Sequence, residues 1–203
     1  MRKTIIAILA STVLFVAAAT EVSAQDVLMN SAETINKGNF KLALFPTVLL
    51  GKNGGDPAWG LAGRFGYGFT PRFDIEAKAA SFKGLTYFGV DAEYWLLQGP
   101  NINASIGLGG HMTNVNGGGD SSGIDTSLLI SARPGAGKLE LYGGLKLAFD
   151  SVKNSDQNFT LAHIVPGLEY AINSDLDFLA EFGIGLNDNS RSYVSVGLAL
   201  YLR

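Results

Sequence analysis

The sequence predicts an all-β fold, a closed antiparallel up-and-down transmembrane β-barrel of about ten strands, with eight strands as the smaller alternative. Three observations predict it. Aliphatic side chains recur at every second position in successive segments, which is the period of a β-strand. No apolar run after residue 24 reaches the ~18 residues of a helical span. Charges within the segments lie on the face opposite the aliphatic side chains.

The start of the chain indicates export. Arg2 and Lys3 precede an uncharged run over 4–20, and the small residue Ala24 ends the segment. A basic start, an apolar run and a small-residue end are typical of a cleaved secretory signal peptide. We therefore predict three parts: a signal peptide over 1–24, a short N-terminal periplasmic stub over 25–38, and a barrel domain over 39–203.

Composition narrows the class of protein. The chain has no cysteine, which excludes disulfides and thiolate metal sites. Without the predicted signal peptide, 13 basic and 17 acidic residues remain, a net charge of about −4. Nucleic-acid binding needs a basic surface, so this balance argues against a nucleic-acid partner. We expect no cofactor and no metal.

The first five predicted strands each combine an apolar row with a polar one. In the third, Phe73 and Ile75 alternate with Asp74 and Glu76. Each segment is long enough to cross a bilayer at the usual tilt, for which ~9–11 residues suffice. These strands are expected at 39–50, 58–69, 72–81, 85–97 and 101–113.

The remaining five strands follow the same pattern to the last residue. We expect the final strand to pair with the first, because an unpaired terminal strand would be an exposed edge. Pro46 and Pro166 each remove a ladder donor, so a bulge or a strand end is expected at both. The predicted strands are 123–133, 138–149, 160–172, 175–187 and 191–203.

The connections alternate in kind. Those after the even-numbered strands are tight, as at Thr70-Pro71 and Asn173-Ser174. Three of those after odd-numbered strands, 51–57, 114–122 and 150–159, are longer and polar. Short periplasmic turns and longer external loops are typical of outer-membrane barrels, which places both termini in the periplasm.

Over 39–203 this pattern resembles the small outer-membrane β-barrel proteins of Gram-negative bacteria, such as the transmembrane domain of OmpA and related porin-like barrels. The resemblance implies outer-membrane lipid and the barrel-insertion machinery as partners, and we expect a monomer. Such families usually end in an aromatic residue that the insertion machinery reads. This chain departs from that pattern, because it ends in Leu202-Arg203 with Tyr201 on the inner face.

Fifteen strand charges are expected to line the lumen. If paired, they fill it and the barrel is structural; if separated, they line a narrow path for ions or small solutes that prefers cations, because nine are acidic and six basic. A soluble lipocalin-like binding barrel and a lipid-modifying outer-membrane enzyme are the alternatives. The fifteen are Lys41, Arg64, Asp74, Glu76, Lys78, Asp91, Glu93, Asp125, Arg133, Lys138, Glu140, Lys146, Glu169, Asp177 and Glu181.

The two histidines are the candidates for catalysis. His111 and His163 face inward, with Asp125 and Ser127 on the strand next to His111. A Ser/His/Asp site needs these groups within hydrogen-bond reach. We expect polar lining of the lumen instead of catalysis, and we interpret the glycine-rich stretch before Asp120 as a flexible loop and not as a metal site.

Overall fold

The structure is a computed structural model, and it describes residues 30–52, 55–116, 119–135 and 137–203. The predicted signal peptide over 1–24 lies outside these residues. No helix in the described ranges is long and apolar enough to cross a membrane. The strands are β1 Phe40–Leu49, β2 Ala58–Thr70, β3 Phe73–Phe82, β4 Leu85–Gln98, β5 Ile102–Val115, β6 Ser121–Ala132, β7 Leu139–Val152, β8 Asn158–Ala171, β9 Leu176–Gly185 and β10 Tyr193–Leu202.

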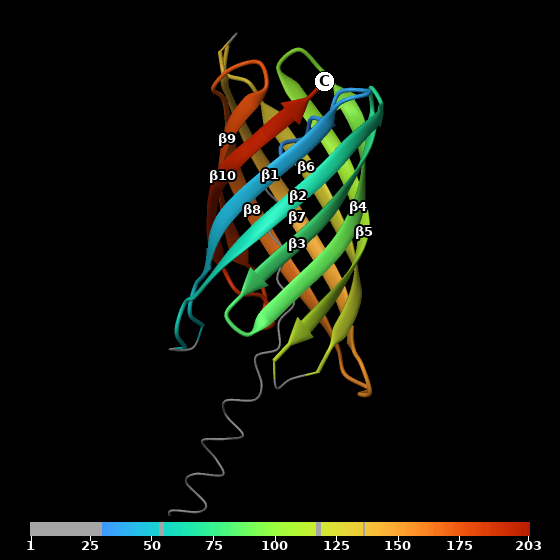
Figure 1. Ribbon diagram of the computed structural model, residues 1–203, viewed down its shortest axis with the longest axis vertical. Helices are drawn as coiled ribbons and strands as arrows, with labels where there is room; N and C mark the ends of the chain where they lie inside the picture. Colours follow the sequence, from blue (N-terminus) through green and yellow to red (C-terminus); the bar gives the residue numbers. More distant parts are fainter. Residues whose placement is uncertain (1–29, 53–54, 117–118, 136) are drawn as a thin grey trace, which may run out of the picture.

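The ten strands form one closed barrel in which each strand is antiparallel to its neighbours (Figure 1). β1 and β10 close it, with Phe40 opposite Leu202 and Leu49 opposite Tyr193. The predicted fold class is confirmed, with ten strands and not eight. Most predicted strand boundaries agree with the structure to within two residues, because the period-two pattern continues almost to each turn.

The barrel has two distinct ends. We call the end where β1 begins and β10 finishes the terminal end; it also carries the connections 71–72, 99–101, 133–138 and 172–175. The loop end carries 50–57, 83–84, 116–120, 153–157 and 186–192. The last of these connections is longer than the three-residue turn expected there, because β9 stops at Gly185 and β10 starts at Tyr193.

The outer wall is aliphatic and aromatic. Leu44, Leu108 and Ile124 are 55%, 63% and 59% exposed, and the other outward positions follow the same pattern. In water, so continuous an apolar surface would promote association, since soluble monomers rarely expose apolar patches above a few hundred Å². A soluble lipocalin-like barrel would turn this face inward, so the observed arrangement contradicts that alternative and fits a wall against lipid.

Aromatic rings inside the barrel pack over glycines of the neighbouring strand. Tyr193 lies opposite Gly183, and Tyr142 lies opposite Gly167. A Cβ on Gly183 would meet the Tyr193 ring at 2.0 Å, and one on Gly167 would meet the Tyr142 ring at 2.2 Å. Each glycine therefore provides the space that its partner's ring fills, as in aromatic rescue of glycine in sheets.

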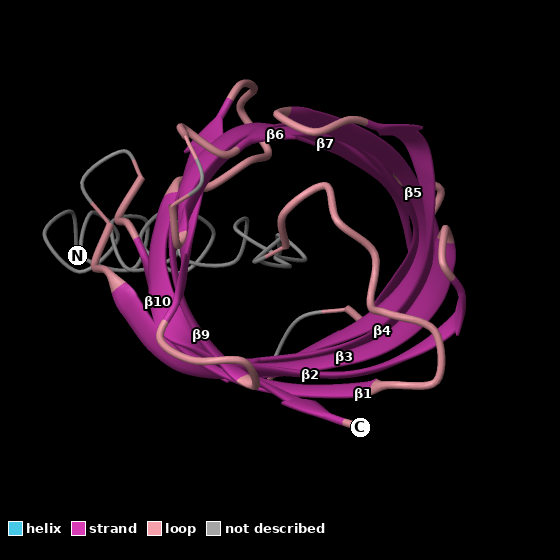
Figure 2. Cartoon of the chain, turned by 90° about the horizontal axis from the view of Figure 1, so that it is seen from above, coloured by secondary structure: helices cyan, strands magenta, loops and turns pink. Residues whose placement is uncertain are grey.

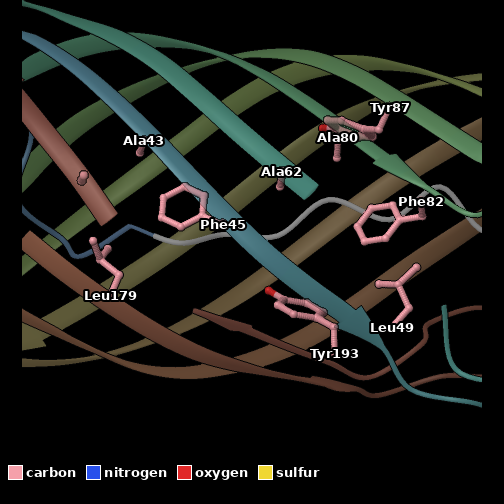
Figure 3. Packing of buried hydrophobic residues seen from close by; sticks show 10 residues of the cluster. Ala43, Phe45, Leu49, Ala62, Ala80, Phe82, Tyr87, Leu179 and Tyr193 are labelled. Atoms are coloured by element: carbon pink, nitrogen blue, oxygen red, sulfur yellow. The ribbon is translucent and has the colours of Figure 1, made fainter. Parts of the chain in front are cut away.

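The Tyr193 ring belongs to an apolar cluster within the lumen (Figure 3). We expected charges and small residues on the inner face, and the structure adds bulky apolar side chains such as Phe45, which is completely buried. The cluster fills space between the polar groups. Its members are Ala43, Phe45, Leu49, Ala62, Ala80, Phe82, Tyr87, Leu179, Tyr193 and Ala199.

The prediction of a bulge or strand end at each proline is wrong. The β1–β10 register passes from Leu44 to Thr47 without a shift, and only the pairs at Phe45 and Pro46 are missing. Similarly, two pairs are missing between β8 and β9 around Pro166. On their other sides Pro46 and Pro166 stay in register with β2 and β7, so the loss of one donor weakens a single ladder locally.

Gly183→Ala should destabilise the barrel by about 1–3 kcal/mol, because the new methyl group overpacks the buried Tyr193 ring. Gly143→Ala is the matched control, since its Cβ meets nothing within 4 Å. Urea unfolding of the refolded barrel in lipid vesicles measures both. Equal stability of the two variants would contradict the proposed packing.

Candidate functional site

Residues 30–37, which we call the lumenal segment, enter the barrel from the terminal end, where Asn36 and Lys37 remain exposed. Asn30, Ser31, Ala32 and Ile35 are buried inside it, and Figure 2 shows the described residues before β1 reaching into the interior of the barrel. From the sequence we predicted a short periplasmic stub over 25–38. The placement of residues 30–37 corrects that interpretation; residues 25–29 lie outside the described ranges.

Two glycines of β2 make room for the lumenal segment. A Cβ on Gly68 would come within 2.3 Å of the backbone oxygens of Ile35 and Asn36. A Cβ on Gly66 would meet the Ile35 side chain at 2.4 Å. Gly68 also forms an isolated parallel bridge with Lys37. The wall of β2 is therefore shaped to receive this segment closely.

Polar contacts hold both halves of the lumenal segment. The Asn30 side chain accepts a hydrogen bond from Lys41 Nζ at 2.6 Å and donates one to Glu93. The backbone N–H of Ile35 donates to Asp74 Oδ2 at 2.6 Å. Between them, Ala32 packs against Leu129 and Val165 in a small buried apolar cluster. The segment thus contacts several strands around the lumen.

Glu33 anchors the segment at the terminal end. Its carboxylate accepts hydrogen bonds from Asn103 at 2.9 Å and from Arg133 at 2.7 Å. Burial and the nearby carboxylates of Glu140 and Glu169 raise the pKa of Glu33 to about 7, while Arg133 acts in the opposite direction. Arg133 also pairs with Glu140 at 3.0 Å, so its guanidinium group bonds to the carboxylates of both Glu33 and Glu140.

A buried ion cluster lies beside the segment. Glu76 pairs with Lys41 at 3.0 Å and with Arg64 at 2.9 Å, and all three side chains are almost fully buried. Lys78 pairs with Asp91 at 2.5 Å. Charges removed from water in this way require partners, because an unpaired buried charge is strongly destabilising.

Nearer the loop end, His111 joins two carboxylates. Its Nδ1 lies 2.8 Å from Asp125 and its Nε2 2.8 Å from Asp150. Tyr87 donates to Asp125 at 3.2 Å, and Ser121 donates to Asp150 at 3.3 Å. Because both ring nitrogens face carboxylates, which accept hydrogen bonds, a protonated imidazole satisfies this arrangement best.

This arrangement is not a catalytic triad. In a triad the serine donates to the histidine, which is then free to accept its proton. Here the Ser121 hydroxyl donates to Asp150 and both nitrogens of His111 are occupied. Ser127 lies on another cavity, away from His111. His163 does share a small cavity with His111, and its Nε2 lies 3.0 Å from the backbone oxygen of Arg191.

The predicted lumen charges divide into several groups in the structure. Besides the ion pairs and the His111 site described above, Glu181 accepts from Tyr142 at 2.9 Å and from Tyr193 at 2.5 Å. Lys146 lines the cavity beside His111, and Glu169 and Asp177 are half-buried. Lys138 differs from the expectation: it precedes β7, is exposed, and donates to the backbone oxygen of Ile172 at the rim.

Side chains and the lumenal segment fill much of the described interior. Small cavities of about 10 Å³ each lie beside His111 and beside Asn30. Each holds about one water molecule. Among the described residues, no group of three or more His, Asp or Glu side chains could hold a metal ion.

The apolar wall and the polar, packed interior define the class of protein as an outer-membrane-type β-barrel. An outer membrane channel from Pseudomonas putida F1 is similar, with a TM-score of 0.55 and 8% identity over 87% of this chain and 100% of that chain. The outer membrane protease OmpT from Escherichia coli has a TM-score of 0.50 and 13% identity over 85% and 100%. These identities show the fold alone. No protein-family model and no curated protein matches the chain.

Glu76→Gln should cost about 3–5 kcal/mol, because Lys41 and Arg64 lose their shared buried carboxylate. Asp175→Asn is the control: it removes the exposed Arg203 pair, which is worth about 0–1 kcal/mol. Urea unfolding in lipid vesicles compares them. A Glu76→Gln barrel as stable as the control would show that the cluster does not contribute in this way.

Docking of the lumenal segment should weaken as pH rises. Docked Glu33 has a pKa of about 7 against 4.5 for the free group, so the docked state binds the proton more tightly. Docking is then strongest below pH 4.5 and weakens as pH rises through 7. We expect the amides of residues 30–37 to have lower hydrogen-exchange protection factors at pH 8 than at pH 5, after correction for intrinsic rates.

Glu33→Gln tests the assignment of this effect. The amide stays neutral at every pH and keeps one of the two oxygens that accept from Asn103 and Arg133. Protection in the variant should therefore change less between pH 5 and pH 8 than in the parent protein. The same pH dependence in both proteins would rule out Glu33 as its source.

Proposed function

We propose that the chain is an integral barrel of the bacterial outer membrane with a structural role, and that its filled interior does not conduct in the state described. One observation carries this proposal: an apolar wall surrounds a packed interior whose cavities beside His111 and Asn30 measure only about 10 Å³ each. The outer-membrane fold of the similar solved structures supports the location.

The orientation and partners are part of this proposal. Removal of residues 1–24 on export and insertion by the barrel machinery fit the pattern of the sequence. The terminal end would face the periplasm, since the turns of such barrels gather there and longer loops lie outside. Lipid contacts the whole outer wall in this arrangement.

We also propose that the barrel is not an enzyme. The lipid-modifying alternative requires catalytic side chains that reach a lipid, but His111 and His163 are both buried in the lumen. The hydrogen bonds around His111 leave no ring nitrogen free to activate a nucleophile. The similarity to a protease is a similarity of fold, and a shared fold does not imply shared catalytic residues.

The mature protein, refolded in detergent, should migrate faster on a gel when unheated than when boiled, because the closed barrel resists denaturation. In planar bilayers it should be almost silent, because the packed lumen leaves no continuous water path. A water-soluble monomer without heat-modifiable migration would refute the membrane barrel. Large, persistent conductance would refute the filled interior.

A further inference from the structure

We infer that the lumenal segment is a removable plug, and that its release opens the terminal half of the lumen to small cations. This inference rests on the proposed function, because it assumes a closed membrane barrel. To the proposed function it adds which segment closes the lumen, and which class of solute enters the lumen once that segment has left.

The seat of the plug is built into the barrel wall. Gly66 and Gly68 leave space that any larger residue would fill with its Cβ. On the opposite side of the lumen, Leu129 and Val165 form an apolar contact for Ala32. A segment that merely collapsed into a pore would not need glycines beneath its backbone and a fitted apolar contact above it.

The plug is held by hydrogen bonds, and the polar groups that make them can bond to water once the plug has left. The side chain of Asn30, the N–H of Ile35 and the carboxylate of Glu33 make its principal polar contacts. The net contribution of such bonds to stability is modest, because the released partners bond to water instead. The segment precedes β1 and belongs to none of the ten strands, so it can leave without breaking the β1–β10 pairs.

The chamber left behind would be acidic. Five acids and three bases interact with the plug or with one of its partners, so the vacated lumen would attract cations and repel anions. Several of these carboxylates lose a bond when the plug leaves, including Asp74 and Glu93. The acids are Asp74, Glu76, Glu93, Glu140 and Glu169, and the bases are Lys41, Arg64 and Arg133.

The rest of the path is closed by side chains. Near the loop end, the small cavity beside His111 is surrounded by Tyr87, His111, Lys146 and His163. The buried apolar cluster around Phe45 and Tyr193 also fills the lumen. Packed side chains still change rotamer without unfolding, whereas a backbone segment bonded to several strands blocks the lumen until it leaves. The plug is therefore the slow barrier, and the narrow loop half limits passage to small ions.

Two variants release the plug by different routes. Gly68→Ala places a methyl group against the segment's backbone from the wall. Ala32→Glu places a charge in the apolar contact with Leu129 and Val165 and leaves the wall unchanged. Gly63→Ala is the matched control on β2, because its Cβ makes only ordinary contacts at 3.4 Å and beyond. Hydrogen exchange of residues 30–37 reports whether the plug has left.

In planar bilayers with a potassium chloride gradient, the parent and Gly63→Ala should be nearly silent. Gly68→Ala and Ala32→Glu should conduct, with the reversal potential shifted towards that of potassium. If the parent opens about 1% of the time, full release raises mean conductance about a hundredfold. Conductance in both release variants would support the plug.

Other outcomes overturn the inference. Silent variants whose residues 30–37 have lost exchange protection would show that the plug does not gate a path. An anion-preferring current would refute the choice of solute. Heat-modifiable migration of every variant is measured in parallel, so loss of the barrel itself, which would count against the proposed function, is distinguished from failure of the plug.

Discussion

The structure depends on the pairing of β1 with β10. In a bilayer no water is available to satisfy a free strand edge, so every backbone N–H and C=O of the wall must bond within the protein. Closing the sheet satisfies that requirement for all ten strands at once. Closure also creates an interior volume that must be filled. A ten-stranded barrel encloses more space than an eight-stranded barrel, whose interior side chains just fill.

Three kinds of filling occupy that space. Aromatic rings such as Tyr193 lie over glycines across the strand, ion pairs centred on Glu76 bring charges together in pairs, and the lumenal segment adds a length of backbone. Each kind of filling has a different effect. Rings remove voids, paired charges satisfy one another, and the segment satisfies carboxylates such as Asp74 that wall partners leave available.

The parts of the structure that depend on local pattern could be predicted from the sequence. A strand repeats every two residues, so the boundaries, the outward rows and the closing pair follow from residues such as Val194, Val196 and Leu198. The site depends on non-local partners instead. Asn30 meets Glu93 across 63 positions of the chain, and His111 meets Asp150 across 39. The periodicity of a sequence does not reveal such pairs. The lumenal segment also lacks the period-two alternation of apolar and polar residues, so its sequence did not indicate that it lies inside the barrel.

The position of the lumenal segment has a consequence for assembly. It lies immediately before β1, while the strand that completes the ring is the last one in the chain. The β1–β10 contacts have the greatest sequence separation of any strand pair here, and contacts of that kind form late in folding because a long loop must be ordered first. The segment can therefore occupy its seat against β2 and β3 while the cylinder is still open. Closure would then complete the wall around a segment that already occupies its seat, so the interior would be filled before the barrel closes.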